Sequence, residues 1–555
     1  MGNGAANLRV CLGLSVSWAA CDADVALRSD PGPADGKGKA TMPDAGSEPI
    51  DGAPEVPPDA APAPLDAPLA DASVDVAPDY TWPSVDAPPE VQDPRCRPAG
   101  GACRVAEGEL DAPPRCADRV APTAFDPEIQ WSWTNPIEPY SIVTPLVANL
   151  TDDNGDGSID LCDIPDIVVV AYQYVFPNPA EPAHIYVLDG WTGAVHYRFQ
   201  EPVENRSTPA VGDIDGDGLV EVVALGYGTH RWPLIAFEHD GTLKWVGEAL
   251  TTHNASAVAL ADLDNDGDVE ILADRVVVNH LGETLWTIPP PDAYTVSFTT
   301  MAADLDGDGD LEVLLGRSTY QHDGTEYWWR NGVGGYPHVA NFDSDPEPEI
   351  LVGANWLLES DGKTVWGPLN TDYYDVSVIH DFDGDGMVEF GAGAYRSYSL
   401  FETDGSVVWS AVTEDLSSRA GGSAFDFLGD GRPVSVYADE KNFFSFGPGG
   451  EVLYTMPRRS GTGDEYPVVA DVDNDGSAEI VVVSSHNADD FEDTTPTVRV
   501  LRDKSECWVQ ARRIWNQHTY HVTNVREDGT IPQFEAPSWE GPNTFRANAP
   551  VTCTP

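Results

Sequence analysis

From about residue 125 onwards, one pattern of apolar and polar positions recurs along the chain. Each copy has an apolar run of strand length, an acidic loop, a second apolar run and a hairpin. Runs such as VEVVALG and LEVLLG are bounded by turns and lack helical periodicity, so they predict strands. The copies cover residues 144–170, 208–226, 256–274, 298–316, 337–353, 377–393, 421–439 and 467–485.

The spacing of the copies predicts a ring of repeated units. The loops recur with a period of about 40–45 residues, which is typical of repeat architectures. Four short strands per unit, repeated radially, form the blade of a β-propeller. A linear β-solenoid is the alternative, but its rungs are shorter than these units. We therefore predict an all-β fold, a β-propeller of about eight four-stranded blades, with seven as the alternative.

The two ends of the repeat region predict how the ring closes. The segment EIQWSWT (128–134) matches the Trp-bearing fourth strand of the other units, and TVRVLRD (497–503) matches a third strand. The first strand would then complete the last blade, which hides the strand edges and joins the two ends of the ring.

One Trp stands at the same point of most hairpins, where a tight Gly turn joins two strands. The hairpins read HDGTLKW, HLGETLW, HDGTEYW, SDGKTVW and TDGSVVW. A single Trp per blade most simply fills the space between neighbouring blades, and ligand stacking is the alternative. The residues are Trp245, Trp286, Trp328, Trp366 and Trp409.

Five of the acidic loops read Asp-x-Asp-x-Asp-Gly-x-x-Glu. Calcium prefers six to eight hard oxygen ligands, and four carboxylates in so short a loop repel one another unless a cation lies among them. In an EF-hand the bidentate Glu stands at position twelve between helices, whereas here it precedes a strand. The predicted ligands are Asp213, Asp215, Asp217 and Glu221; Asp262, Asp264, Asp266 and Glu270; Asp304, Asp306, Asp308 and Glu312; Asp381, Asp383, Asp385 and Glu389; and Asp471, Asp473, Asp475 and Glu479.

The other three loops depart from this pattern. Copy five has Pro346 where Gly belongs, so its site is in doubt. Copy seven has Leu428 and Val434 at ligand positions, which predicts loss of the metal. Copy one carries a full loop inside an insertion, with Asn149 and Asp166 as ligands for a second ion. The predicted ligands are Asp152, Asn154, Asp156 and Asp160 in copy one, and Asn341, Asp343, Asp345 and Glu349 in copy five.

The loops, the strand order and the period resemble the FG-GAP/VCBS repeats of the integrin α-chain N-terminal propeller and its bacterial relatives. The resemblance covers roughly residues 125–510. It implies structural calcium on the loops of one rim, and we expect about five to seven Ca²⁺ ions. Extracellular sites of this kind have dissociation constants on the order of 0.1–1 mM.

The first part of the chain differs in composition. Residues 1–21 contain a short apolar stretch that ends in Ala19-Ala20-Cys21, which resembles a secretory signal with a lipobox, although Trp18 departs from the motif. An ordinary cleaved signal or a misplaced start codon are the alternatives. Residues 22–94 are rich in Pro, Ala and Asp and predict a disordered tether. We expect the protein to be exported, either to the cell surface or outer envelope or to the extracellular space.

Residues 95–124 form a small segment with three Cys. In an exported protein, Cys residues without paired CxxC spacing predict disulfides rather than a zinc site. Six Cys allow fifteen pairings, and our prediction is Cys96–Cys103, Cys116–Cys553 and Cys162–Cys507.

Residues 511–555 form a tail rich in Trp, Asn, His and Arg. The stretch from Ala511 resembles a segment at the end of FG-GAP-type sets in secreted bacterial proteins. We expect it to pack on the last blade, close the propeller or lead to a further module. A metal or catalytic role for His518 and His521 is the less favoured alternative.

The net charge of −62 argues against binding to nucleic acid or an anionic membrane surface. We expect a monomer that contacts a membrane only through an anchor at Cys21. The sequence has no nucleophile elbow, His-Glu-x-x-His motif, phosphate loop or dinucleotide fingerprint.

Three functions remain open. The leading one is a non-enzymatic, calcium-stabilised propeller that binds a protein or glycan, or acts in cell adhesion. The second is a polysaccharide lyase, since some rhamnogalacturonan lyases are similar calcium propellers; His253, His338 and Arg419 are its candidate residues. The third is an envelope assembly factor, but the propellers of that class lack calcium loops.

Overall fold

The computed structural model describes residues 124–174, 182–228, 232–250, 257–288, 299–369, 373–463, 465–486 and 495–550. The predicted signal, the lipidation of Cys21, the tether 22–94 and the predicted Cys96–Cys103 and Cys116–Cys553 bridges lie outside these residues, as does His253. The bridge between Cys162 and Cys507 stays a prediction. Within the described ranges, no helix has the length and apolar character needed to cross a bilayer.

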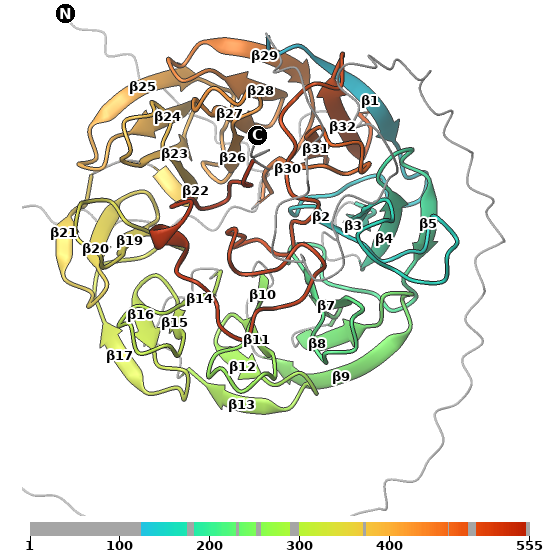
Figure 1. Cartoon of the computed structure of the whole chain (residues 1–555), viewed down its shortest axis with the longest axis horizontal. Coiled ribbons are helices and arrows are strands. Elements are labelled where there is room, and N and C mark those ends of the chain that lie inside the picture. Colours follow the sequence, from blue (N-terminus) through green and yellow to red (C-terminus); the bar gives the residue numbers. More distant parts are fainter. Residues whose placement is uncertain are drawn as a thin grey trace, which may run out of the picture. The chain divides into compact units, whose positions relative to one another are not determined.

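The described chain folds into eight four-stranded antiparallel sheets arranged as the blades of a ring, which confirms the predicted propeller and its larger blade number (Figure 1). Blade 1 contains β2 (Leu146–Ala148), β3 (Asp166–Tyr172), β4 (Ala183–Asp189) and β5 (Val195–Arg198). Blade 2 contains β6 (Ala210–Gly212), β7 (Glu221–Leu225), β8 (Trp232–Phe237) and β9 (Leu243–Leu250). Blade 3 contains β10 (Val258–Ala261), β11 (Glu270–Ala273), β12 (Val276–Val278) and β13 (Thr284–Thr287). Blade 4 contains β14 (Met301–Ala303), β15 (Glu312–Leu314), β16 (Ser318–Tyr320) and β17 (Glu326–Trp329).

The second half of the ring repeats the same order, and the last blade borrows the first strand of the chain. Blade 5 contains β18 (Pro337–Ala340), β19 (Glu349–Val352), β20 (Trp356–Glu359) and β21 (Thr364–Trp366). Blade 6 contains β22 (Tyr373–His380), β23 (Glu389–Ala394), β24 (Ser397–Phe401) and β25 (Val407–Val412). Blade 7 contains β26 (Gly422–Phe425), β27 (Val434–Ala438), β28 (Asn442–Phe446) and β29 (Val452–Pro457). Blade 8 contains β30 (Val468–Ala470), β31 (Glu479–Val483), β32 (Val498–Asp503) and β1 (Pro127–Trp133).

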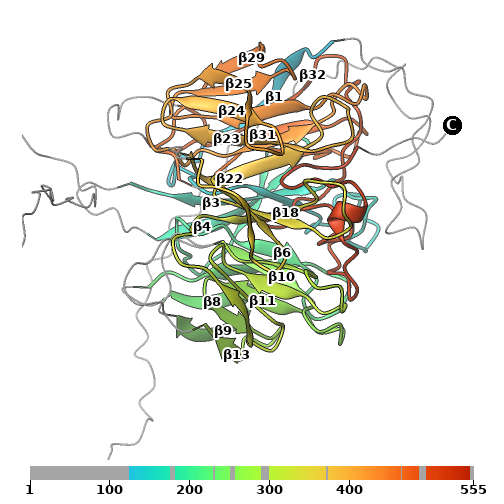
Figure 2. The same cartoon turned by 90° about the vertical axis from the view of Figure 1, so that its left-hand side faces the viewer.

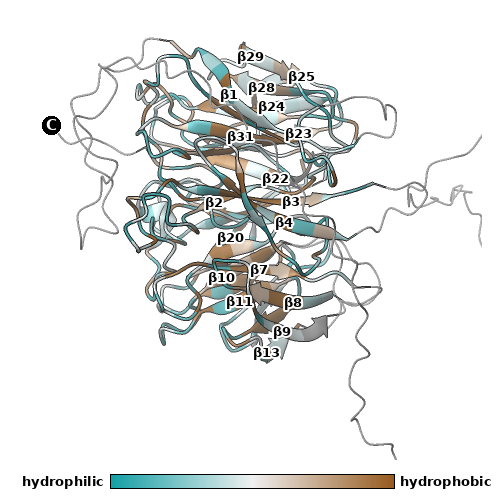
Figure 3. Ribbon diagram, turned by 90° about the vertical axis from the view of Figure 1, so that its right-hand side faces the viewer, coloured by the Kyte–Doolittle hydropathy of each residue, from teal (hydrophilic) through white to brown (hydrophobic). Residues whose placement is uncertain are grey.

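The burial of each strand follows from its place in the blade. The first and second strands are short apolar runs buried along their whole length, and Figure 3 shows this apolar character in the inner strands. The fourth strand forms the outer edge and alternates between exposed and half-buried positions, as in β25. Strands buried on both faces read as continuous apolar runs, and a strand exposed on one face alternates.

Ring closure takes the predicted form. Strand β1 pairs antiparallel with β32, from Pro127 opposite Asp503 to Trp133 opposite Val498. The first described strand is therefore the outer strand of blade 8, and no end of the sheet series is left unpaired.

The hairpin Trp residues are structural, as predicted. Each indole N–H donates a hydrogen bond of 2.7–3.0 Å to a carbonyl oxygen in the hairpin of the next blade. The indole ring also lies against the hairpin Gly of that next blade in five of these cases. The donor and acceptor pairs are Trp131–Gly190, Trp245–His280, Trp286–His322, Trp328–Ser360, Trp366–Thr403 and Trp409–Pro448.

We expect Gly282→Ala to destabilise the contact between blades 2 and 3. Gly282 has φ +80°, and a Cβ there would lie 2.6 Å from the Trp245 ring. Left-handed backbone and overpacking each cost about 1–3 kcal/mol. The loss is measured by urea denaturation, with Gly334→Ala as the control because a Cβ at Gly334 meets nothing within 4 Å. Equal stability of the two variants would contradict this packing role.

The C-terminal segment from about residue 508 lies across one face of the ring and fills its centre, with its short 3₁₀ helix η1 (Ser538–Glu540) on that face beside the inner strands of blades 5 and 6 (Figures 1 and 2). Trp515 exchanges two backbone hydrogen bonds with Val147 of β2, and Phe545 exchanges two with Ile379 of β22. The same segment contacts the first strand, or the loop that follows it, in six further blades. We call the segment from about residue 508 the plug, and it is not confined to the last blade. These contacts involve Asn516 with Val211, Gln517 with Leu260, Trp539 beside Asp304, Asn543 with Asn341, Ala547 with Ala424, and Arg512 with Asp471.

Candidate functional site

The acidic loops join the first and second strands of each blade and therefore meet at one face of the ring. In seven blades a carboxylate at the start of the second strand turns back over the loop. Its oxygen accepts a hydrogen bond of 2.6–3.0 Å from the backbone N–H of the second loop residue. The pairs are Asp166–Leu150, Glu221–Ile214, Glu270–Leu263, Glu312–Leu305, Glu349–Phe342, Glu389–Phe382 and Glu479–Val472.

The first Asp of the loop closes the turn. Asp381 accepts the backbone N–H groups of Gly384 and Gly386 at 2.7 and 2.9 Å, and Asp304 accepts those of Gly307 and Gly309 at 2.7 and 3.1 Å. Each of these Asp residues uses both of its carboxylate oxygens in the turn. Single ligand oxygens lie within 4.8 Å of one another in the sets Asp213, Asp215 and Glu221; Asp262, Asp264 and Glu270; Asp304, Asp306 and Asp308; and Asp343, Asp345 and Glu349.

Several buried loop oxygens have no hydrogen-bond partner among the described residues. They are Oε1 of Glu312, Oε1 of Glu349 and Oδ1 of Asp262. The side chains of Glu312 and Glu349 are at most 1 % exposed. A buried carboxylate oxygen without a donor is costly, and a hard cation among these oxygens would remove that cost. The donor set and its geometry therefore fit Ca²⁺.

Burial has a clear electrostatic effect on the second-strand Glu residues. Removal from water, with additional repulsion from the loop Asp residues, raises the pKa of Glu270 and of Glu312 to about 8. The same causes raise the pKa of Glu349 and of Glu389 to about 7. Without a cation these groups hold protons near neutral pH, so cation binding would release protons.

In calcium-free buffer we expect the free energy of unfolding to fall as the pH rises from about 5 to about 8. The folded-state pKa values of Glu270 and Glu312 lie above the ordinary value of 4.5, so the folded chain binds more protons than the unfolded chain in this range. The stability present below about pH 4.5 is therefore lost as the pH passes the folded pKa. Urea denaturation with and without calcium measures this, and calcium should flatten the dependence. Stability that rises with pH in chelator would contradict the expectation.

Copy one has two acidic groups rather than one. In the insertion, Asp152 accepts the N–H groups of Gly155, Asp156 and Gly157 at 2.7–3.1 Å, which is the same turn as in the other loops. Separately, Asp166 lies close to Asp153 and to His196 of β5, whose Nε2 is 3.4 Å from Asp166. Asp166 was predicted as an additional ligand, whereas Asp153 and His196 were missed.

Copies five and seven also differ from the five regular loops. In copy five, Asp343, Asp345 and Glu349 cluster despite Pro346. The amide of Asn341 stays within the loop, where its Nδ2 donates to the Asp345 carbonyl oxygen at 2.6 Å and its Oδ1 accepts the Asp343 N–H at 3.0 Å. In copy seven, Asp426 keeps the loop turn by accepting the N–H of Gly431 at 2.8 Å, although the turn has no Glu before the second strand.

His338, a candidate residue for lyase chemistry, is enclosed by other side chains. His338 is fully buried, and its Nε2 accepts hydrogen bonds from the Ser377 N–H at 3.0 Å and from the Arg546 guanidinium of the plug. Its Nδ1 therefore carries the proton and donates to the Leu351 carbonyl at 3.1 Å. Burial and the Arg546 charge hold the pKa of His338 well below its usual range. This imidazole is neutral, and both of its nitrogens are used in the packing.

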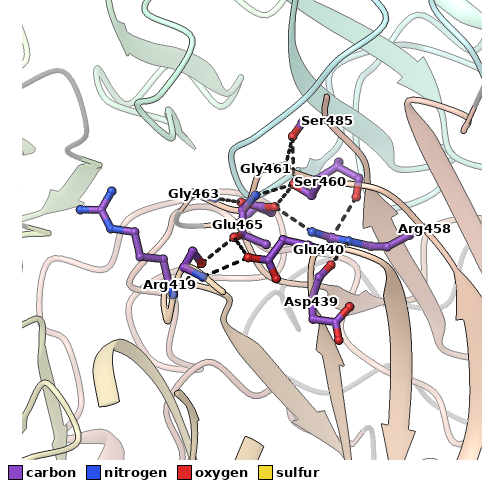
Figure 4. Close-up of polar contacts among 12 residues, drawn as sticks. Arg419, Asp439, Glu440, Arg458, Ser460, Gly461, Gly463, Glu465 and Ser485 are labelled. Carbon is purple, nitrogen blue, oxygen red and sulfur yellow. Dashed lines mark hydrogen bonds and ion pairs between the residues drawn. The ribbon is translucent and has the colours of Figure 1, made fainter. Parts of the chain in front are cut away.

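Arg419 lies on the opposite face, where connections pass from one blade to the next. Figure 4 shows its guanidinium pointing away from Glu440 and Glu465. The groups around those carboxylates form a buried structural network: Arg458 contacts Glu465 at 2.8 Å, with both side chains 1 % exposed. The structure does not bring Arg419 and His338 into one site.

The two tail histidines, His518 and His521, make different contacts within the plug. His521 Nε2 lies 2.5 Å from Glu535 Oε1, and its Nδ1 contacts the Thr519 carbonyl. His518 lies edge-on to the rings of Tyr336 and Tyr466 inside the plug.

Comparison with known proteins agrees with this architecture. The FG-GAP-like repeat family matches residues 213–273. No curated protein matches the sequence. Among solved structures, the V. cholerae biofilm matrix protein Bap1 is similar with a TM-score of 0.66 and 22 % identity, covering 76 % of this chain and 98 % of that one.

Two rhamnogalacturonan lyases are also similar. The exotype lyase YesX has a TM-score of 0.48 and 15 % identity over 70 % of this chain and 75 % of its own. The lyase YesW has a TM-score of 0.44 and 16 % identity over 68 % and 75 %. At these identities the likeness concerns the fold alone. The repeated blades, the acidic loops and the family match identify the chain as an eight-bladed β-propeller that contains FG-GAP-like repeats.

Proposed function

We propose that the protein is a calcium-stabilised extracellular β-propeller that acts as a ligand-binding or adhesion scaffold at the cell surface, without enzymatic activity. The observation that carries this proposal is the closed centre of the ring. Aromatic and charged side chains of the plug occupy it, and Trp515, Tyr520, Phe545 and Arg546 are each 0 % exposed. A propeller filled in this way presents rims rather than a channel to its surroundings.

The calcium part of the proposal is supported by the loops. Carboxylates predicted from the sequence cluster with ligand oxygens within 4.8 Å of one another, and buried oxygens of Asp262, Glu312 and Glu349 lack donors within the described chain. Ions bound there would tie the first two strands of a blade together and offset part of the large negative charge. We propose this for the regular loops of blades 3, 4, 6 and 8 and for the insertion of copy one.

A cavity of about 370 Å³ lies on the acidic-loop face, and we propose it as the site that binds the ligand. It lies between blades 4 and 5 beneath η1, and its lining includes the aromatic side chains of Tyr327 and Trp539 beside Asp306 and Glu347. Aromatic faces next to oxygen-rich groups suit a glycan or a cationic peptide side chain. The ligand, a protein or a glycan, would be held at the rim of a monomer that is exported and anchored, if lipidated, at Cys21.

The test mixes the calcium-loaded full chain with a panel of acidic and neutral polysaccharides and records two signals. One is retention of the protein on the immobilised polysaccharide, and the other is absorbance from unsaturated products. We expect retention that chelator abolishes, with no growth of absorbance. Trp539→Ala should weaken retention at least tenfold, while Phe534→Ala, at a side chain 72 % exposed on the same segment, should not.

Growth of absorbance that stops on chelation would establish a lyase and overturn the scaffold proposal. Retention that is equal for Trp539→Ala and Phe534→Ala would move the binding surface away from this cavity. Retention on no polysaccharide would exclude these glycans as ligands and leave a protein partner, to be identified by crosslinking on intact cells.

A further inference from the structure

The outer strand of every blade contains the same irregularity. In all eight blades the pairing of the third and fourth strands shifts by one residue, and in blades 1 to 7 the shift lies close to the hairpin that joins these strands. The shift leaves one fourth-strand residue without a partner across the sheet, as in a β-bulge. In the order of the blades, these bulge residues are His196, Lys244, Leu285, Tyr327, Val365, Val408, Leu453 and Gln130.

The bulge residue lies over the acidic loop of its own blade wherever its side chain is polar. Gln130 donates from Nε2 to Asp473 at 2.8 Å, and His196 lies 3.4 Å from Asp166. Tyr327 lines the cavity that also contains Asp304 and Asp306. Where the bulge residue is polar, its side chain therefore reaches from the outer strand of the blade to the acidic loop.

In blade 2 that side chain is a cation. The Lys244 ammonium lies 2.6 Å from Asp215, 3.2 Å from Glu221 and 3.1 Å from Glu238, and its side chain is only 15 % exposed. Asp215 and Glu221 are the same carboxylates that cluster with Asp213 as a metal group. The ammonium therefore contacts the oxygens that an ion would need.

The loops of two other blades, the regular loop of blade 4 and the loop of blade 5, show what Lys244 replaces. In blades 4 and 5, Oε1 of Glu312 and of Glu349 is buried and has no donor among the described residues. In blade 2 the equivalent Oε1 of Glu221 accepts a hydrogen bond from Lys244 at 3.2 Å. Calcium binds carboxylate oxygens at 2.3–2.6 Å, so an ion and the ammonium would compete for one space and repel each other there.

We propose that blade 2 binds no calcium and that Lys244 acts as its built-in cation. The loop Asp213, Asp215, Asp217 and Glu221, which the sequence pattern predicts to be a calcium site, then has part of its negative charge offset by Lys244 at every calcium concentration. The inference rests on the proposed function in one respect, namely that the regular loops of other blades do hold calcium.

Calcium stoichiometry of the full-length protein tests this inference. The chain is equilibrated by dialysis against about 10 mM CaCl₂ in about 150 mM KCl, and bound calcium is counted by atomic absorption. We expect Lys244→Met to bind one ion more than the wild type, with a dissociation constant on the order of 0.1–1 mM at the new site. Lys363→Met is the matched control, because it removes the same charge from a side chain 78 % exposed, and it should leave the count unchanged.

A reciprocal variant tests the inference even if Lys244→Met folds poorly. Leu285 is the bulge residue of blade 3 and is 50 % exposed, so Leu285→Lys places an ammonium over a regular loop without removing core packing. We expect it to bind one ion fewer than the wild type. Counts equal to the wild type in both variants would overturn the inference. A wild type that binds no calcium at all would instead overturn the proposed function.

Discussion

Addition of a calcium chelator to the full-length protein is expected to lower its melting temperature by about 5–10 °C. At about tenfold excess of calcium over the dissociation constant, each site contributes about 1.4 kcal/mol, so the four regular loops and the insertion of copy one together contribute about 7 kcal/mol. Unfolding entropy of roughly 2.1 cal/mol/K per residue, over a ring of roughly 400 residues, converts this energy into the stated shift. Differential scanning calorimetry with calcium and with chelator measures it.

Two comparisons make this expectation specific. Magnesium at the same concentration should restore little of the loss, since it demands a smaller, nearly octahedral set of ligands. Asp381→Asn, in the regular loop of blade 6, should remove roughly a fifth of the calcium effect, because Asp381 closes the turn and is one of the predicted ligands of one of the five proposed sites. Identical melting curves in calcium and chelator would show that the acidic loops are folded without a bound metal and that calcium does not stabilise the protein.

Removal of the plug is expected to abolish folding of the ring. A chain that ends before Trp508 would lose four aromatic side chains that are 0 % exposed, namely Trp508, Trp515, Tyr520 and Phe545. Burial of each contributes about 1.5–3 kcal/mol, and their sum matches the whole stability of a typical domain, about 5–15 kcal/mol. The backbone groups of Val147 and Ile379 on the inner strands would also lose their partners.

The truncated chain should appear in the insoluble fraction or bind a dye for exposed apolar surface. Arg546→Met is the milder companion, because it keeps the plug but removes the donor to His338 and Ser377. We expect that variant to fold with a loss of about 1–3 kcal/mol, the cost of leaving buried acceptors without a donor. A soluble, cooperatively melting truncated chain would contradict the structural role of the plug.

The blade architecture was accessible from the sequence because each blade is a local unit. Strands such as β7 and β15 are apolar runs next to acidic turns, and the interval between turns reveals the repeat. Closure through β1 was also predictable, since Trp131 and Trp133 stand where the fourth strand of another unit has its Trp.

The features that depend on register and on long-range contact were not predictable in this way. Lys244 reaches Glu221 only because the pairing of β8 and β9 shifts at Phe237, and no sequence pattern reports that shift. The plug was expected near the last blade, yet Phe545 pairs with Ile379 of blade 6. Its irregular backbone carries no periodicity, so its partners follow from the shape of the cavity it fills.

The pairing of β1 with β32 fixes the order in which the molecule can be built. Glu128 and Arg502 meet in the same blade although almost the whole ring separates them along the chain. Blades 1 to 7 can form one after another as the chain emerges, but the last blade must wait for its third strand, and the plug must wait longer still. Until then β1 is an open edge able to pair with another chain. We therefore expect closure of the ring to be the slowest and most aggregation-sensitive step of its folding.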